Sequence, residues 1–537
     1  MNVLLWYFKR LKSLSVRELG YRAKQVVQGR IEKRFTKISF EPVSYNTVPL
    51  TILHIENYDE LYFNFDIHLF GLEILPSQIK DWSYDFFSKK TFPPIYSKDI
   101  NMRTDKYGSA KHVWEYNRML FLPQLALAYK KTGNRKYFDE IIALLDSWIE
   151  QNPYLIGINW YSNIEINIRL INWFLTWEIL DVDSLVKVDP VVKKFVEDKW
   201  IPTIYQHCKY SFDHPSLYSS ANNHLISEYS GLFIATSKWR FKESENWNVC
   251  AKAGLEREIV KQHSRNGVNK EEAAEYIQFI TDFFLLPMLV ADNTGDPFSQ
   301  TYKTTFRNIL HYIYNFLDVK GNFPKYGDED DGRVFVVDEF HKNNFISLLT
   351  FGATYFKTPE LVFAGAGFDQ KNLLFFGEQG RRIFAELTEQ ASSLRSSSGY
   401  PNEGHFILRK QVSESKEIYC HFDAAPLGFL SIAAHGHADA LSFIIHIDGQ
   451  PVFIDSGTFC YHTHPQWRKY FLSTLAHNTV TVNNDDQAKF IGPTLWLNHY
   501  TVKTKEHSFS DTVDSVTAEH DGYKKYGITH TRKIEFF

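Results

Sequence analysis

Residues 435–457 read HGHADALSFIIHIDGQPVFIDSG and hold the clearest turn in the chain. Asp448-Gly449 separates two apolar runs, and this dipeptide favours a two-residue β-hairpin in which both φ angles are positive. Short alternating runs with turn residues between them lie on both sides. Strands at this spacing predict a β-sandwich or another large antiparallel sheet. The other runs are GHFILRK (404–410), EIYCHFDAA (417–425), HNTVTVNN (477–484), NHYTVKTKEHS (498–508), TVDSVTAEH (512–520) and THTRKIEFF (529–537).

The preceding part of the chain has a helical pattern, because apolar residues recur there at three- and four-residue spacing. Gly, Pro or Asn breaks separate about nine such segments, with almost no strand pattern between them. Helix pairs in succession form a solenoid or a closed α/α toroid, and the absence of a repeat of fixed period favours the toroid. The predicted helices are 114–134, 136–153, 163–180, 191–212, 222–239, 248–264, 271–292, 304–317 and 343–356.

These patterns predict three regions. We expect an arm of helices and loops at 1–95, an (α/α) toroid at 96–375 and an antiparallel β-sandwich at 390–537. The last run still has the pattern of a strand at Phe537, so we expect the sandwich to be truncated at its C-terminal end.

Charge and hydropathy exclude some classes of protein. Lys plus Arg total 59 and Asp plus Glu total 63, which does not suit a protein that coats nucleic acid. No run reaches the roughly 20 apolar residues of a transmembrane helix. The apolar run before Lys9 is too short for a secretory signal, so we expect either a cytoplasmic location or export information that is missing from this chain. A basic amphipathic segment lying on a membrane surface is an alternative to a plain packing helix at the N-terminus.

Histidine and aspartate side chains near the hairpin form a candidate metal site. His435 and His437 lie two residues apart, Asp455 follows the hairpin, and His477 opens the next predicted strand. Imidazole nitrogens with one carboxylate suit zinc. The alternative is that these histidines are only hydrogen bonded at strand ends.

The hairpin register bears on this candidate. With Asp448-Gly449 as the turn, Asp455 lies opposite Ser442, and an extended chain leaves His437 roughly 15 Å away. A loop around Gly436 must therefore fold back for the metal site to close.

Polar residues at a predicted helix start form a second candidate. Asn222, Asn223 and His224 begin the helix, and Glu228 follows one turn later. Asn is an ordinary N-cap residue, but two amides and an imidazole at a helix N-terminus also suit an anion. His224 and Glu228 could equally form a surface pair.

Three further features are less specific. Tyr276 lies in the first turns of an amphipathic helix, and Glu165 and Arg169 lie four residues apart on one helix face, which favours an internal ion pair. The loop KYGDEDDGR carries Asp328, Asp330 and Asp331, but lacks the spacing of a calcium loop.

Taken in order, these motifs resemble the heparinase II/III family of polysaccharide lyases, which includes heparinase III and related alginate lyases. The resemblance covers roughly residues 80–537 and rests most specifically on HGHADALSF followed by FIDSGTFCY. The supporting motifs are WEYNR, NWYSNIEINIRLINW, NNHL, the EEAAEY helix and GDEDDGR. The resemblance implies an N-terminal α/α toroid joined to an antiparallel β-sandwich, and a periplasmic location.

The resemblance also implies an activity, which is cleavage of an acidic, uronate-containing polysaccharide by β-elimination. Asn223 and His224 match the residues that neutralise the uronate carboxylate. Tyr276 matches the catalytic tyrosine, which protonates the leaving oxygen and in syn elimination also takes the C5 proton. His435 matches the general base used when that proton lies on the opposite face.

Further residues are assigned by the same resemblance. His437, Asp455 and His477 match positions that hold a structural zinc in some members, where it braces the His435 loop. We expect Arg118, Glu165, Arg169 and Glu228 to contact the substrate or shape the cleft floor.

Two other functions are consistent with the sequence. A glycoside hydrolase on the same toroid needs two carboxylates about 5–10 Å apart, which Glu165, Glu228, Glu271 and Glu272 could supply. A non-catalytic glycan-binding or assembly protein of surface polysaccharide synthesis would keep the cleft without turnover.

Overall fold

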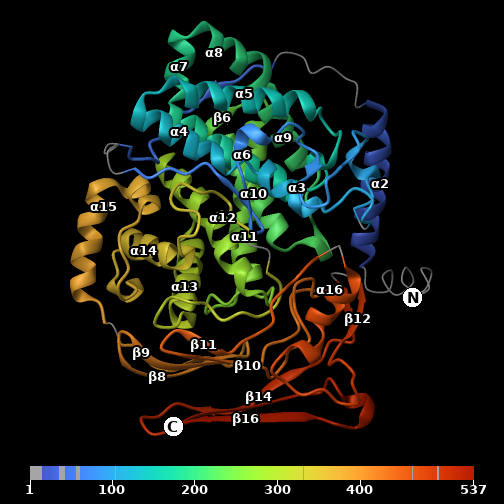
Figure 1. The fold of residues 1–537 in the computed structure, drawn as a ribbon, viewed down its shortest axis with the longest axis vertical. Coiled ribbons are helices and arrows are strands. Elements are labelled where there is room, and N and C mark those ends of the chain that lie inside the picture. The colour runs from blue at the N-terminus through green and yellow to red at the C-terminus, as the bar shows by residue number, and fades with distance from the viewer. Residues whose placement is uncertain are drawn as a thin grey trace.

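The computed structural model describes residues 15–35, 43–55, 61–102, 104–329, 332–392, 394–461, 464–492 and 495–537. A helical lobe is followed by a β lobe that lies beneath it in Figure 1, and helix α2 (Val16–Phe35) runs along the outer side. This is the predicted fold of a helical toroid followed by an antiparallel β domain.

The helical lobe is built from consecutive helices that pack in pairs. Its central members are α6 (Asn163–Leu180), α10 (Asn223–Lys238) and α12 (Ala274–Asn293), whose side chains are buried on nearly every face. A helix that is apolar all round belongs inside a larger core. The other helices are α3 (Ala110–Asn117), α4 (Phe121–Thr132), α5 (Arg135–Gln151), α7 (Val182–Val188), α8 (Pro190–Phe195), α9 (Ile201–Asp213), α11 (Ser244–Gln262), α13 (Gln300–Phe316), α14 (Asn344–Phe356) and α15 (Gln370–Gln390).

Helix α12 is long and apolar enough to cross a membrane, but 89% of its most apolar window is buried inside the lobe. Burial against neighbouring helices accounts for this composition.

The β lobe contains two main antiparallel sheets. The five-stranded sheet has the order β11-β10-β9-β8-β7, and the three-stranded sheet has the order β14-β15-β16. Side chains of β8 and β9 face both ways, because Ile407 and Tyr419 join the core of the helical lobe while Phe406 and Phe422 pack toward the three-stranded sheet. The strands are β7 (Ser398–Tyr400), β8 (His405–Ser413), β9 (Lys416–Asp423), β10 (Phe443–Ile447), β11 (Gln450–Phe453), β12 (Lys489–Gly492), β13 (Leu495–Leu497), β14 (Val502–Ser508), β15 (Asp514–His520) and β16 (His530–Phe536).

The predicted hairpin is confirmed, but its register is not. Asp448 and Gly449 have φ angles of 53° and 72° and join β10 to β11. A bulge shifts the pairing, so that Ile445 lies opposite Phe453. The predicted pairing of Asp455 with Ser442 is therefore wrong.

Three other predictions of secondary structure are wrong. The segment 477–484 is not a strand. It binds the neighbouring backbone through a side chain, since Asn478 Nδ2 donates to the carbonyls of Phe443 and Ile454. The predicted helix 114–134 is divided into α3 and α4, where Met119 has a φ of 58°. Helix α15 is not among the predicted helices, and it is interrupted at Gly377, which has a φ of 59°.

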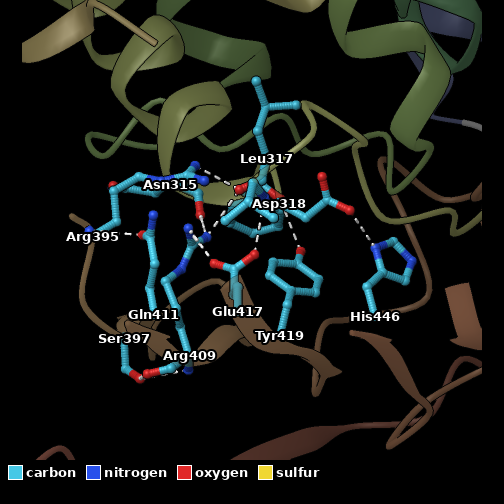
Figure 2. A network of polar contacts seen from close by, with 12 residues as sticks. Asn315, Leu317, Asp318, Arg395, Ser397, Arg409, Gln411, Glu417, Tyr419 and His446 are labelled. Atoms are coloured by element: carbon cyan, nitrogen blue, oxygen red, sulfur yellow. Dashed lines mark hydrogen bonds and ion pairs between the residues drawn. The ribbon is translucent and has the colours of Figure 1, made fainter. Parts of the chain in front are cut away.

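A polar network joins the two lobes at the C-terminal end of α13 (Figure 2). Arg409 of β8 donates to the carbonyl oxygens of Asn315 at 2.8 Å and Leu317 at 3.0 Å, and its guanidinium pairs with Glu417 at 2.9 Å. Tyr419 donates to the carbonyl of Phe316 at 2.8 Å. Cations and donors from the β lobe thus satisfy the unpaired carbonyls that every helix leaves at its C-terminus.

Candidate active site between the lobes

Asn222 and Asn223 have different tasks at the start of α10. Asn222 is the N-cap, and its side-chain oxygen accepts from the backbone N–H of His224 at 3.2 Å. Asn223 gives both its backbone N–H and its Nδ2 to the carboxylate of Glu271, at 2.6 and 2.8 Å. Because Asn223 Oδ1 is buried and has no hydrogen-bond partner, Glu271 fixes one end of this amide only.

Tyr276 lies in the first turn of α12, as predicted, and contacts the β lobe. Its ring centroid is 4.5 Å from that of His435, and its hydroxyl is 2.9 Å from the hydroxyl of Tyr461. His435 Nε2 is 3.3 Å from Asn222 Nδ2 and 3.8 Å from Glu271. Groups from helices α10 and α12 therefore meet a histidine of the β lobe at one place.

The carboxylate of Asp328 lies between His435 and His437 and contacts both. Its carboxylate contacts Nδ1 of His435 at 3.2 Å and Nε2 of His437 at 3.0 Å. Arg468 of α16 (Pro465–Leu472) donates to both carboxylate oxygens, at 2.7 Å for Oδ2. One buried carboxylate thus links two histidines and an arginine.

The charges in this cluster shift the pKa values of its members. Burial opposes ionisation of Asp328, but Arg468 and the two histidines outweigh it and hold the pKa of Asp328 well below its usual value. Burial alone would lower the pKa of His435, but the hydrogen bond to Asp328 and the charge of Glu271 raise it. The arrangement favours the ionised carboxylate together with a charged His435 imidazole.

Two glycines allow the segments to approach this closely. A Cβ at Gly436 would lie 1.6 Å from the carbonyl oxygen of Leu427, and a Cβ at Gly327 would lie 1.9 Å from that of Glu272. Only glycine fits at such approaches. The fold-back around Gly436 was deduced from a hairpin register that the structure does not have, so it stays a prediction.

The reacting groups are nearly enclosed in this structure. The exposed fractions are 1% for Asn223, 5% for Tyr276 and 7% for His435, while His224 is half-buried. Tyr461, from the segment after β11, covers the hydroxyl of Tyr276.

The candidate metal ligands also come together. One donor atom each from His437, Asp455 and His477 lies within 4.8 Å of the others, and all three residues are buried. Nδ1 of His437 and Nε2 of His477 are buried without a hydrogen-bond partner. Nδ1 of His477 contacts Asp455 at 2.6 Å. Unpartnered imidazole nitrogens beside a carboxylate are the donor set that zinc binds.

Acidic neighbours determine the charge of this group. Burial disfavours charge on His477, but Asp455 outweighs it and raises the pKa of His477 to about 9. Burial lowers the pKa of His437. Burial and mutual repulsion raise the pKa values of Asp423 and Asp439 nearby. The surroundings are thus rich in carboxylates that a cation would stabilise.

The residues predicted to contact substrate lie inside the helical lobe. Glu165 pairs with Arg118 at 2.7 Å rather than with Arg169, so the predicted partner was wrong. Arg169 instead donates to His207 at 3.2 Å and to the carbonyl of Asn159.

Glu228 is buried as well, and its carboxylate accepts from the backbone and the hydroxyl of Ser216 at 2.7 and 2.6 Å. It is therefore not part of a surface pair with His224. The exposed fractions of Arg118, Glu165, Arg169 and Glu228 are 2% or less, so in this arrangement the four stabilise the scaffold around the site.

Four residues of this centre were not predicted as site residues. Asp328 and Tyr461 lie in motifs that the sequence did single out, GDEDDGR and FIDSGTFCY, whereas Glu271 was considered only as a hydrolase carboxylate. Arg468 carried no signal, because its partner is 140 positions away. Asp330 and Asp331 lie outside the described residues.

Comparisons with known proteins agree with this architecture. Residues 71–349 match the family description Heparinase II/III N-terminus, and residues 393–537 match Heparinase II/III-like, C-terminal.

Two curated relatives are both named heparin-sulfate lyase. The protein from Pedobacter heparinus is 24% identical over 408 residues, which are 73% of this chain and 55% of the relative. The protein from Bacteroides thetaiotaomicron is 23% identical over 476 residues, which are 83% of this chain and 61% of the relative. The chain therefore spans less than two thirds of the length of these relatives.

Solved structures share the fold. A crystal structure of a heparan sulfate lyase from Pedobacter heparinus has a TM-score of 0.53 at 20% identity, covering 82% of this chain and 63% of that one. A crystal structure of heparinase III has a TM-score of 0.59 at 15% identity, covering 97% and 75%.

Proposed function

Because this chain belongs to the heparinase II/III family, we propose that it is a polysaccharide lyase that cleaves an acidic, uronate-containing glycan by β-elimination. The observation that carries the proposal is the meeting of Asn223 and Tyr276 from the helical lobe with His435 from the β lobe. The relatives named heparin-sulfate lyase support a glycosaminoglycan as the substrate class. Alginate, a second uronate polymer, is the alternative substrate.

Neutralisation of the uronate carboxylate is the first task of the site. The C5 proton of a uronate becomes acidic enough to remove only when the neighbouring carboxylate is neutralised. At the N-terminus of α10, which favours anions, Asn223 can donate through the second N–H of the Nδ2 group that also binds Glu271, and His224 can donate through its imidazole. Donors fixed in advance stabilise the enolate as its charge develops. Glu271 keeps the Asn223 amide in a single orientation.

Elimination then needs one base and one acid. The base takes the C5 proton, the C–H electron pair forms the C4–C5 double bond, and the bond from C4 to the glycosidic oxygen breaks. Tyr276 gives its hydroxyl proton to that oxygen. In syn elimination, Tyr276 starts as the phenolate, takes the C5 proton and then passes it on to the glycosidic oxygen. When the C5 proton lies on the opposite face, His435 is the base, and it must first lose the proton that Asp328 and Glu271 favour on its imidazole.

Substrate entry requires the β-lobe segment that carries Tyr461 to move off Tyr276. The hydroxyl of Tyr461 lies 2.9 Å from the hydroxyl of Tyr276. The leaving oxygen of the substrate would have to lie at this same hydrogen-bonding distance from Tyr276. Exclusion of water once substrate is bound would keep solvent from returning a proton to C5, so that the Tyr276 proton goes to the leaving oxygen.

A hydrolytic mechanism has weaker support. Its two carboxylates would have to face the sugar, but the four candidates are engaged elsewhere. Glu165 pairs with Arg118, Glu228 accepts from Ser216, Glu271 holds Asn223, and Glu272 contacts His405 at 2.9 Å.

We also propose that His437, Asp455 and His477 hold a zinc ion. The two unpartnered imidazole nitrogens and the adjacent carboxylate fit that ion. A bound zinc would supply positive charge to the acidic pocket and crosslink the segments on either side of the hairpin. His437 also contacts Asp328, which in turn contacts His435, so the ion would brace the catalytic loop.

The test is to incubate the purified protein with heparan sulfate, alginate and hyaluronan, and to follow ultraviolet absorbance of the unsaturated uronate. A lyase produces this chromophore, whereas a hydrolase produces only reducing ends. Chain shortening without the chromophore, or no change with any uronate polymer, would contradict the proposal.

A further inference from the structure

Helix α2 attaches to the helical lobe through its polar face. Glu18 and Arg22 contact the hydroxyls of Ser219 and Ser220, and Arg22 lies 3.0 Å from the latter. Glu32 pairs with His214 at 2.9 Å and accepts from Tyr96 at 3.1 Å. The inner side of this helix is therefore held by hydrogen bonds and ion pairs.

The opposite face of α2 is apolar and points to solvent. Helical spacing puts Val16, Leu19, Val27 and Ile31 on that side, with Val26 at its edge. Their exposed fractions are 86%, 39%, 55%, 52% and 56% in that order. A helix on the surface of a globular protein normally turns its apolar side inward. In α2 the orientation is reversed, so the sequence maintains an apolar surface away from the core.

Positive charge lies within and beside this apolar stripe, because helical spacing puts Arg34 in line with Val16 and Arg30 between Val16 and Leu19. Five cationic residues of α2 are exposed on the outer half of the helix: Arg17, Lys24, Arg30, Lys33 and Arg34. The two acidic residues of the helix, Glu18 and Glu32, are both turned inward. Asp99 pairs with Lys33 at 2.5 Å, which leaves the outer face cationic overall.

We propose that the outer face of α2 binds the surface of a membrane that contains anionic lipids. An interfacial helix lies in the plane of the membrane with apolar side chains inserted and Lys and Arg at the headgroups, which is the arrangement of α2. Figure 1 shows α2 along the outside of the helical lobe.

Two other occupants fit this face less well. An acidic glycan would pair with the cations but would gain little from Val27 and Ile31, because its surface is charged and hydrated. A second copy of the chain would bury the apolar stripe but would place two cationic faces opposite each other.

The test is co-sedimentation of the full chain with vesicles of phosphatidylcholine alone or mixed with phosphatidylglycerol. We expect binding to the mixed vesicles, weakened by salt on the order of 0.5 M because screening shortens the reach of the cations. Val27→Glu/Ile31→Glu should lower the bound-to-free ratio by roughly tenfold or more. Arg30→Glu/Arg34→Glu should lower it to a similar degree on anionic vesicles.

A matched control uses the same chemical change on another exposed helix face. Val249 and Val260 of α11 are 64% and 48% exposed, and Val249→Glu/Val260→Glu should leave vesicle binding unchanged. Thermal unfolding of each variant checks folding, and Val27→Ser/Ile31→Ser replaces the glutamate pair if that pair misfolds.

Several results would overturn the proposal. The proposal is wrong if the wild-type chain does not bind anionic vesicles. It is also wrong if the α2 variants bind these vesicles as well as the α11 variant does. A dimer in solution that Val27→Glu/Ile31→Glu dissociates would instead assign the face to a second copy. Loss of heparin binding in the arginine variant, without any vesicle binding by the wild type, would assign it to an acidic glycan.

Discussion

The hydroxyl of Tyr276 is the group on which proton transfer depends in the proposed reaction. Tyr276→Phe keeps the ring that packs at 4.5 Å from His435 but removes the donor to the leaving oxygen. We expect kcat to fall by about 10²–10⁴, the usual contribution of a general acid. Product absorbance measures the rate, and Tyr137→Phe on α5 is the control. Unchanged turnover in Tyr276→Phe would remove Tyr276 from the mechanism.

Glu271 is predicted to act through Asn223 and not on the sugar itself. Asn223→Ala should cost about 10²–10³ in kcat with little change in KM, because it removes a donor that matters most in the transition state. Glu271→Gln keeps the shape of the side chain but weakens its hold on the Asn223 amide, so we expect a smaller loss of kcat.

A double-mutant cycle distinguishes this positioning role from an independent one. If Glu271 acts through Asn223, the Asn223→Ala/Glu271→Gln variant should be no slower than Asn223→Ala alone. Rate losses that multiply would show that Glu271 contributes separately, for example through His435, which lies 3.8 Å away.

The proposed zinc ion would connect the loops on either side of the β10–β11 hairpin. Because a metal that binds only the folded state stabilises it by about 2.7 kcal/mol at a hundredfold excess over Kd, a chelator should lower Tm by several degrees. His437→Ala should lower Tm in untreated protein and abolish any further effect of the chelator.

Elemental analysis measures the zinc bound per chain directly, and this measurement does not depend on enzyme activity. About one zinc per chain is expected in the wild type and much less in His437→Ala. His311→Ala, a half-buried histidine of α13 that lies beside Glu360, is the control and should retain the metal. A wild-type protein without zinc, and with a Tm that a chelator leaves unchanged, would contradict the proposal.

The sequence predicted elements whose structure depends on near neighbours. Asp448-Gly449 forms the predicted turn because its conformation is determined by two residues. The helical pattern predicted α6 and α12 for the same reason. Segment 477–484 has the alternation of a strand, but Asn478 and Thr479 use their side chains to bond the neighbouring backbone, so no ladder forms. Local pattern cannot distinguish these outcomes.

Partners that lie far apart in the sequence could not be predicted from spacing. Glu165 has Arg169 four residues away, yet its carboxylate bonds Arg118, the C-cap residue of α3, because helix packing places that guanidinium beside it. Asp328 was noted only as part of an acidic loop, and its role depends on His435 and Arg468, which lie more than a hundred residues later. The resemblance supplied Asn223, Tyr276 and His435; the structure added the residues that hold them.

At the scale of the whole molecule, the site exists only while the two lobes keep their relative position. The network in Figure 2 fixes that position, because Arg409 and Tyr419 of the β lobe bond the carbonyls at the end of α13. Arg409 and Glu417 are buried and paired at 2.9 Å. We expect Arg409→Met to destabilise the protein by about 3–5 kcal/mol, since it leaves a buried carboxylate without its cation. Denaturant unfolding measures the loss.

The pH dependence of Arg409→Met separates this charge effect from loss of packing. Burial already raises the pKa of Glu417, and Arg409 opposes that rise, so the substitution should raise the pKa further. A carboxyl whose pKa is higher in the folded state than in the unfolded state binds a proton on folding. The loss in free energy of unfolding relative to wild type should therefore be complete at a pH above the pKa of Glu417 in the folded state. It should shrink as the pH falls toward the ordinary pKa of Glu. Arg409→Met/Glu417→Gln lacks the charge but keeps an acceptor for the Val319 N–H, so it should regain much of the stability and lose the pH dependence. A deficit that is equal at every pH and in both variants would mean that Arg409 serves only as packing, and that the lobes are held together by their apolar contacts.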